Sequence, residues 1–135
     1  MNFIIPAIPI AQPRQRHTRE GRNYIPAGHP VHAFKATVRY TVQQGFTDAP
    51  IEGPLRLYAV FVLPRPKNMT WKTKPMPRVP HTIAPDADNL LKALQDSLNG
   101  LLWKDDAQVH HAVIEKWIAS GSEQPHVELE VVEVT

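Results

Sequence analysis

The sequence contains no cysteine. Disulfide bonds, thiolate nucleophiles and cysteine-ligated zinc sites are therefore excluded. No apolar run is long enough to cross a bilayer, and the first residues lack the charged start and uninterrupted apolar stretch of a signal peptide. We therefore expect a soluble, cytoplasmic protein that makes no contact with a membrane.

Carboxylates are also missing from the whole segment between Gly53 and Pro85, although six lysines and arginines fall there. Over residues 1–85 basic side chains outnumber acidic ones by nine, and over residues 86–135 acidic side chains outnumber basic ones by seven. This separation of charge is typical of a protein that binds a polyanion with one surface and collects cations with another. The alternative is that the two halves simply pair with each other.

The length of 135 residues predicts a single domain, residues 1–135, with enough chain to bury a core. The 14 prolines cluster in residues 6–30 and 64–85, which should be loops. Apolar periodicity and turn residues predict, in chain order, an edge strand at 2–10, a helix at 30–44, a central strand at 55–63, a helix at 86–98, and strands at 108–118 and 126–134. This order predicts an α/β (α+β) fold, a single compact domain with a small mixed β-sheet and two main helices.

Four aspartates surround the second predicted helix: Asp86 and Asp88 at its start, Asp105 and Asp106 beyond its end. Mg²⁺ prefers oxygen ligands, keeps several waters and needs only a few carboxylates. Asp86 and Asp88 point to one side if the chain is extended there. Helix capping is the alternative for Asp88, a common one, but it explains neither Asp86 nor the later pair. The stretch therefore indicates a site for a hard metal ion.

Lys92 lies one helical turn after Asp88 and so on the same face of the helix. A surface ion pair between the two is one reading, and it would be worth only about 0.3–0.5 kcal/mol. In the functional reading, Lys92 stabilises the negative charge that develops on a phosphate during cleavage. A site of this composition is typical of metal-assisted hydrolysis of a phosphodiester.

Two basic segments are candidates for phosphate contacts. Arg14, Arg16, Arg19 and Arg22 fall in a glycine-punctuated loop, which is either a phosphate-binding arm or simply a solvated loop. The proline-rich loop 64–85 carries Trp71 among lysines. Trp71 either stacks on an unpaired base or anchors the loop to the body of the protein. The seven histidines show no metal-binding spacing and are assigned to structural or surface roles.

The run DADNLLKA at 86–93, followed by WKDDAQV at 103–109, resembles the signature of the RusA family of Holliday junction resolvases, which are often prophage-encoded. The paired motif D-x-D-N-L-x-K and D-D-x-Q-V at this separation is highly specific. A looser resemblance covers the whole chain, including the arginine-rich loop and the final pair of strands. In length and order the chain resembles one family domain with nothing appended.

The resemblance implies a homodimer that binds four-way DNA junctions and nicks two opposed strands symmetrically, in DNA recombination and repair. It implies Mg²⁺ as cofactor, with Mn²⁺ as a substitute, and no small-molecule cofactor. By motif position it assigns metal binding and catalysis to Asp86, Asp88 and Asp106, with Asp105 in support and Lys92 as the catalytic lysine. These carboxylates should lie close enough to share an ion, with Lys92 alongside.

The expected DNA contacts combine the two basic segments with one residue of the motif: Arg14, Arg16, Arg19, Arg22, Lys72, Lys74, Arg78 and Asn89. Some family members have a basic residue directly before the first aspartate, where this chain has Ala84 and Pro85. We expect Lys72, Lys74 or Arg78 to take over that contact. Two alternatives to a junction resolvase are a broader nuclease acting on forks and flaps, and a junction-binding protein whose acids only cap helices.

Overall fold

The computed structural model describes residues 1–135. Its elements, in chain order, are β1 (Asn2–Ile5), β2 (Arg16–His17), β3 (Asn23–Tyr24), α1 (Pro30–Gly45), β4 (Leu55–Leu63), the 3-10 turn η1 (Lys67–Met69), β5 (Val79–Pro80), α2 (Ala87–Leu98), the 3-10 turn η2 (Asp106–Gln108), β6 (Val109–Ile118) and β7 (His126–Glu133). No helix is long and apolar enough to cross a membrane.

Five strands form one mixed sheet in the order β1-β7-β4-β6-β5. β4 is the central strand; it pairs with β6 in parallel and with β7 in antiparallel orientation. Its second half is buried on both faces, which explains the continuous apolar run that the sequence shows there. The edge beside β6 is largely open, because β5 pairs only with Trp117 and Ile118 at the end of that strand.

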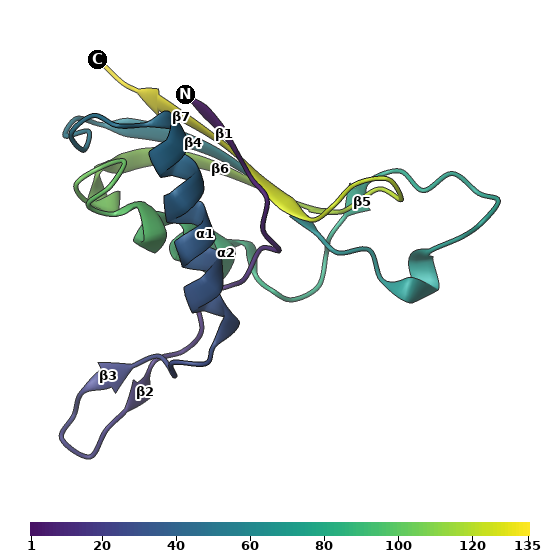
Figure 1. Ribbon diagram of the computed structural model, residues 1–135, viewed down its shortest axis with the longest axis horizontal. Helices are drawn as coiled ribbons and strands as arrows, with labels where there is room; N and C mark the ends of the chain where they lie inside the picture. The colour runs from purple at the N-terminus through teal and green to yellow at the C-terminus, as the bar shows by residue number, and fades with distance from the viewer.

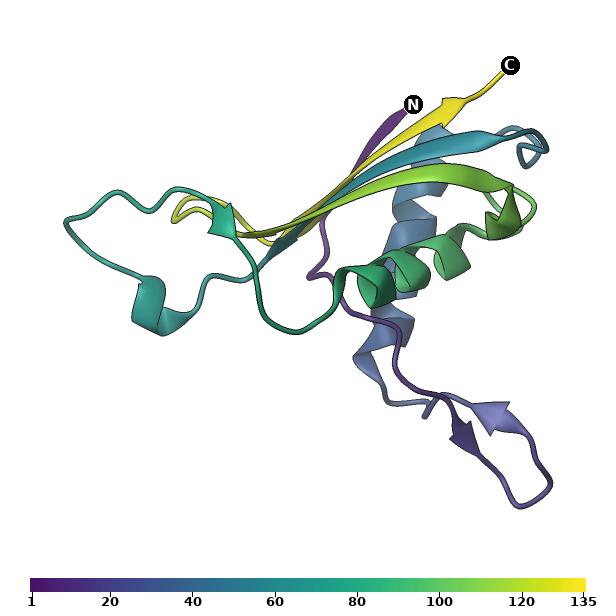
Figure 2. The ribbon, with the colours of Figure 1, turned by 180° about the vertical axis from the view of Figure 1, so that it is seen from behind.

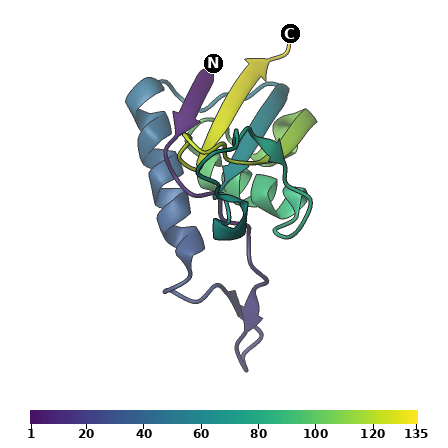
Figure 3. The same cartoon turned by 90° about the vertical axis from the view of Figure 1, so that its right-hand side faces the viewer.

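The main core lies between the sheet and the two helices, which cover the same face of the sheet (Figure 3). Apolar residues at helical spacing, such as Val38 of α1 and Leu94 of α2, pack there against Phe61 and Leu129 of the sheet. α1 contacts β1 and α2, whereas α2 lies toward β6. The predicted α+β class, with two helices and a mixed sheet, is confirmed.

Five predicted element boundaries differ from the structure, four of them by a single residue. The N-terminal strand ends at Ile5 rather than at residue 10, because Pro6 and Pro9 cannot donate to a strand ladder. The second helix begins at Ala87, and Asp86 is its extended N-cap residue. The strand at 55–63 coincides with β4.

Two segments project from the body of the domain (Figures 1 and 2). We call residues 12–28 the hairpin arm, because β2 and β3 pair within it and Gly21 turns the chain with a φ of +80°. We call residues 64–78 the basic arm; it contains η1 and leads into β5. The sequence predicted both as loops and missed the short hairpin, whose strands are only two residues long.

Candidate functional site

The start of α2 presents two exposed carboxylates. Asp86 is the N-cap residue, with φ −72° and ψ 145°, yet its side chain makes no capping hydrogen bond. Asp88 lies in the first helical turn, where its Oδ1 accepts a bond of 3.0 Å from the Asn89 backbone N–H. The chain is therefore not extended over both aspartates: Asp86 has an extended backbone, whereas Asp88 is already helical. Asp88 is not the capping residue either, and the helix dipole favours both charges at this end.

The start of α2 is fixed in place by neighbours from two other parts of the chain. Lys116 of β6 donates from Nζ to the carbonyl oxygens of Ile83 and Pro85, at 2.8 and 2.7 Å. The backbone N–H of Gln12 donates to the Asn89 carbonyl at 3.0 Å, which joins the root of the hairpin arm to α2. Lys116 has no motif around it, so sequence reasoning missed this anchoring role.

Asp105 has a structural task that the sequence did not reveal. It is the N-cap of η2, and its Oδ2 accepts from the Ala107 backbone N–H at 3.1 Å. The Gln108 side chain accepts in return from the Asp105 backbone N–H at 2.9 Å, which completes a capping box. The expectation that capping does not account for Asp105 is therefore wrong. Asp106 follows as the first residue of the turn, half-buried.

Within one chain the aspartates do not converge. No group of three or more histidine or acidic side chains is placed to hold a metal ion. Asp86 lies at the end of α2 that Lys116 fixes, whereas Asp106 directly precedes β6, beyond the other end of the helix. A helix of 12 residues spans about 18 Å. The carboxylate oxygens of Asp86 and Asp88 suit a hard cation, and two carboxylates are enough for Mg²⁺; Asp106 of the same chain is too far away to join them.

Lys92 is exposed on 60% of its side chain and lies 3.9 Å from Asp96, one turn further along α2. Asp96 also lies 4.0 Å from Lys35 of α1, whose pKa is lowered by burial. The surface ion pair between Lys92 and Asp88, which was one of the two readings of their spacing, is therefore not formed. Both contacts are at the distance limit for an ion pair, so Lys92 is only weakly held and remains free to reach an approaching phosphate.

The predicted DNA-contacting residues fall into two groups. Arg14, Arg16, Arg19 and Arg22 are exposed along the hairpin arm, and Lys72 and Lys74 are exposed on the basic arm. Arg78 differs, because its guanidinium donates to Glu123 at 2.7 Å and to Glu128 at 2.6 Å. Its charge is thus neutralised within the chain, and its assigned phosphate contact competes with two carboxylates.

The Arg78 cluster fixes the base of the basic arm to the turn between β6 and β7. The bonds from Arg78 lower the pKa of Glu123 to about 2. Burial alone would raise the pKa of Glu128, but the bonds from Arg78 and His126 outweigh it and the net change is downward. The anchor is therefore an ionised pair of glutamates that holds one arginine.

Glu123→Gln is expected to lower the free energy of unfolding at pH 7 by about 1 kcal/mol, because side-chain exposures of 32% for Arg78 and 24% for Glu123 leave the pair partly screened. The folded pKa of Glu123 lies below the ordinary value of 4.5. Its contribution is therefore complete above about pH 4.5 and is lost as the pH falls toward 2. Urea unfolding across this range should show the difference shrink. Glu133→Gln is the control, since Glu133 forms no ion pair; a difference independent of pH would contradict the assignment.

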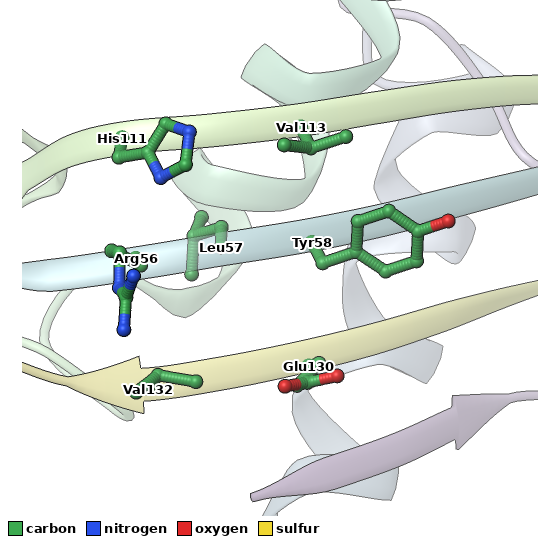
Figure 4. Close-up of a pocket in the computed structure, with 7 residues that line it drawn as sticks. All are labelled: Arg56, Leu57, Tyr58, His111, Val113, Glu130 and Val132. Atoms are coloured by element: carbon green, nitrogen blue, oxygen red, sulfur yellow. The ribbon is translucent and has the colours of Figure 1, made fainter.

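The open face of the sheet, opposite the helices, carries a shallow hollow (Figure 4). Arg56 and His111 lie at one end, and Tyr58 and Glu130 lie at the other. The Tyr58 hydroxyl donates to Glu115, which raises the pKa of Tyr58 and lowers that of Glu115. This hollow faces away from α2 and contains none of the predicted site residues. The candidate site is instead an exposed surface around the start of α2.

An α+β domain with a carboxylate-bearing helix start between two basic projections is typical of proteins that act on polyanions. The comparisons with known proteins identify the family. The model of the family endodeoxyribonuclease RusA matches residues 5–132, and the chain therefore belongs to the RusA endodeoxyribonuclease family. The chain is also 30% identical over 141 residues to the uncharacterized protein YqaN of Bacillus subtilis (strain 168), covering 100% of this chain and 97% of YqaN.

Proposed function

We propose that the protein is a Mg²⁺-dependent, structure-specific endodeoxyribonuclease that resolves four-way DNA junctions by paired, symmetric nicks. Membership in the RusA family supports the reaction class. One structural observation carries the proposal further: the acidic start of α2 lies between the two arms, bonded to the root of the hairpin arm through Gln12 and Asn89 and joined to the basic arm by the loop that leads on from β5 (Figure 2). A DNA strand whose phosphates are bound by both arms would pass the start of α2.

The arms supply binding that does not depend on sequence. The four arginines of the hairpin arm and Lys72 and Lys74 of the basic arm are exposed cations on surfaces that project from the domain. Contacts of this kind position a phosphate backbone without reading bases. Arg78 is not included, because Glu123 and Glu128 bind its Nε and one of its terminal nitrogens and neutralise its charge. In this proposal the two arms provide the affinity for DNA, and the start of α2 provides the groups that hydrolyse the phosphodiester.

In the proposed mechanism, Asp86 and Asp88 hold the cation, and Lys92 reaches the scissile phosphate from one helical turn away. When bound, Mg²⁺ supplies charge neutralisation and activation of water. The Asp86 carboxylate is available because it makes no capping bond. Lys92 donates to the phosphate oxygens as negative charge grows on them, which its weak contact with Asp96 permits. Asn89, adjacent and exposed, offers a further donor to the backbone of the DNA.

Homodimerisation fits both the substrate and the distribution of acids. The part of β6 from Val109 to Glu115 has no strand beside it on its outer edge, because the chain around β5 pairs only with Lys116 and the residues after it. Such an edge is a ready template for another strand. Antiparallel pairing of β6 with its copy across a two-fold axis would lay the two α2 helices side by side in opposite directions. The partner subunit's Asp106 would then approach Asp86 and Asp88, completing a three-carboxylate set that one chain lacks.

The test is nicking of an end-labelled four-way junction with and without Mg²⁺, beside fork, flap and linear duplex substrates at the same salt concentration, because phosphate-driven binding falls steeply with salt. We expect metal-dependent cuts at symmetric positions in two opposed strands of the junction. Faster cutting of forks and flaps than of junctions would assign the broader branch nuclease instead. Junction binding without cutting in Mg²⁺ or Mn²⁺ would leave a non-catalytic junction-binding protein.

A further inference from the structure

Trp71 lies in the middle of the basic arm, with 37% of its surface exposed. It belongs to neither of the hydrophobic clusters of the domain. The indole N–H groups of Trp103 and Trp117 donate to Asn99 and Glu115, respectively, whereas that of Trp71 donates to no group of the protein. A large aromatic ring is thus displayed on a projecting segment without serving the core.

Two cations flank the ring. The guanidinium carbon of Arg65 lies 5.0 Å from the ring centroid of Trp71, and Nζ of Lys74 lies 5.5 Å from it. Both distances are within the range of cation–π attraction. Arg65 is fixed, because it also donates to backbone carbonyl oxygens within and beyond the arm: Met69 at 2.6 Å, Pro77 at 2.9 Å and Ala119 at 3.3 Å. Lys74 is exposed and forms no ion pair, so it can leave the ring.

Other residues anchor the arm, so Trp71 is not needed for that purpose. Arg65 ties the start of the arm to Ala119 of the body. At the other end, the Gly121 N–H donates to the Met76 carbonyl at 2.8 Å, and Arg78 binds Glu123 and Glu128. Trp71 itself contributes its ring contact with Arg65 and a backbone N–H bond of 3.2 Å to the Met76 sulfur. The arm is held at both roots, and the ring becomes accessible when Lys74 moves away from it.

We propose that Trp71 is a stacking platform for an unpaired nucleobase, with Lys72 and Lys74 bound to the phosphates on either side of it. This inference rests on the proposed function, in which the ligand of the arm is branched DNA, and it names the part of that DNA which the arm recognises. An indole stacks on any base without regard to its identity. In a DNA duplex each base is already stacked on its neighbours, so the indole ring of Trp71 cannot reach its face. Trp71 therefore adds affinity wherever a branch leaves bases unpaired.

The test compares binding to two DNAs of equal length and phosphate number, in EDTA so that no cutting occurs. One is a continuous duplex, and the other contains a run of unpaired thymines. Trp71→Ala should weaken binding to the unpaired DNA roughly 5- to 150-fold, the range for loss of one base–aromatic stack. It should leave duplex binding almost unchanged. Trp71→Phe, which keeps an aromatic face, should retain most of the affinity.

Indole fluorescence gives a second readout. Oligothymidine should quench the emission of the unaltered protein. The quenching should disappear in Trp71→Phe, in which only the buried Trp103 and the half-buried Trp117 remain. An unchanged affinity of Trp71→Ala for unpaired DNA, or an equal loss on both DNAs, would overturn the proposal. Binding is measured in EDTA, so it does not depend on nuclease activity. If the protein loses affinity for unpaired DNA in Trp71→Ala but never nicks a junction in Mg²⁺, the stacking proposal stands and only the proposed nuclease activity is refuted.

Discussion

Asp88→Asn is expected to abolish nicking of a four-way junction in Mg²⁺ while junction binding persists. The substitution preserves the shape of the side chain and the oxygen that accepts from the Asn89 N–H. It removes the negative charge that a cation needs at the start of α2. A metal contributes several kcal/mol to stabilisation of the transition state, and each 1.36 kcal/mol is a factor of ten. The nicking rate should therefore fall on the order of 10³-fold or more.

The measurement is single-turnover cleavage of a labelled junction with enzyme in excess, beside a gel-shift titration in EDTA. Asp48→Asn is the matched control, since Asp48 is exposed, forms no ion pair and lies outside the motif. It should cut at the unaltered rate. Full activity of Asp88→Asn, or cutting without metal, would remove Asp88 from the site. Loss of binding in step with loss of cutting would mean that the substitution damages the fold instead.

The fold was predictable because its main signals are local. The apolar run from Leu55 to Leu63 and the helical spacing of Leu91, Leu94 and Leu98 each predict one element, and the structure confirms both elements. In α2, however, Leu90 and not Leu91 is the fully buried residue of that stripe. The order of elements then predicts the α+β class. The hairpin arm was missed because strands of two residues leave no periodicity.

The candidate site was less predictable, because it depends on contacts between distant segments. Periodicity places Asp86 and Lys92 on one helix, but it does not place the start of that helix against Lys116 or beside Gln12. The capping task of Asp105 depends on a 3-10 turn of only three residues. Above all, the family resemblance implied that Asp106 lies near Asp86, whereas α2 separates them by its full length.

Because Asp106 lies far from Asp86 and Asp88 in one chain, activity should depend on how the altered residues are distributed between the two subunits of a dimer. We expect Asp88→Asn and Asp106→Asn proteins to be inactive alone and to regain activity when combined in one heterodimer. If each site takes Asp86 and Asp88 from one subunit and Asp106 from the other, both altered residues fall in the same site of this heterodimer. The second site is then intact. The heterodimer should nick one strand of each junction at about half the unaltered rate, starting from homodimers slower by about 10³-fold.

Two affinity tags, one on each variant, allow the heterodimer to be isolated, and different labels on the two cut strands separate single nicks from paired ones. The reciprocal control joins an unaltered subunit to one that carries both Asp88→Asn and Asp106→Asn. With shared sites, each of its two sites contains one altered residue, so this heterodimer should be inactive. With sites built within single chains, the outcomes reverse: the first heterodimer stays inactive and the control keeps half its activity. The open edge of β6 would then need another occupant, and Asp106 another role.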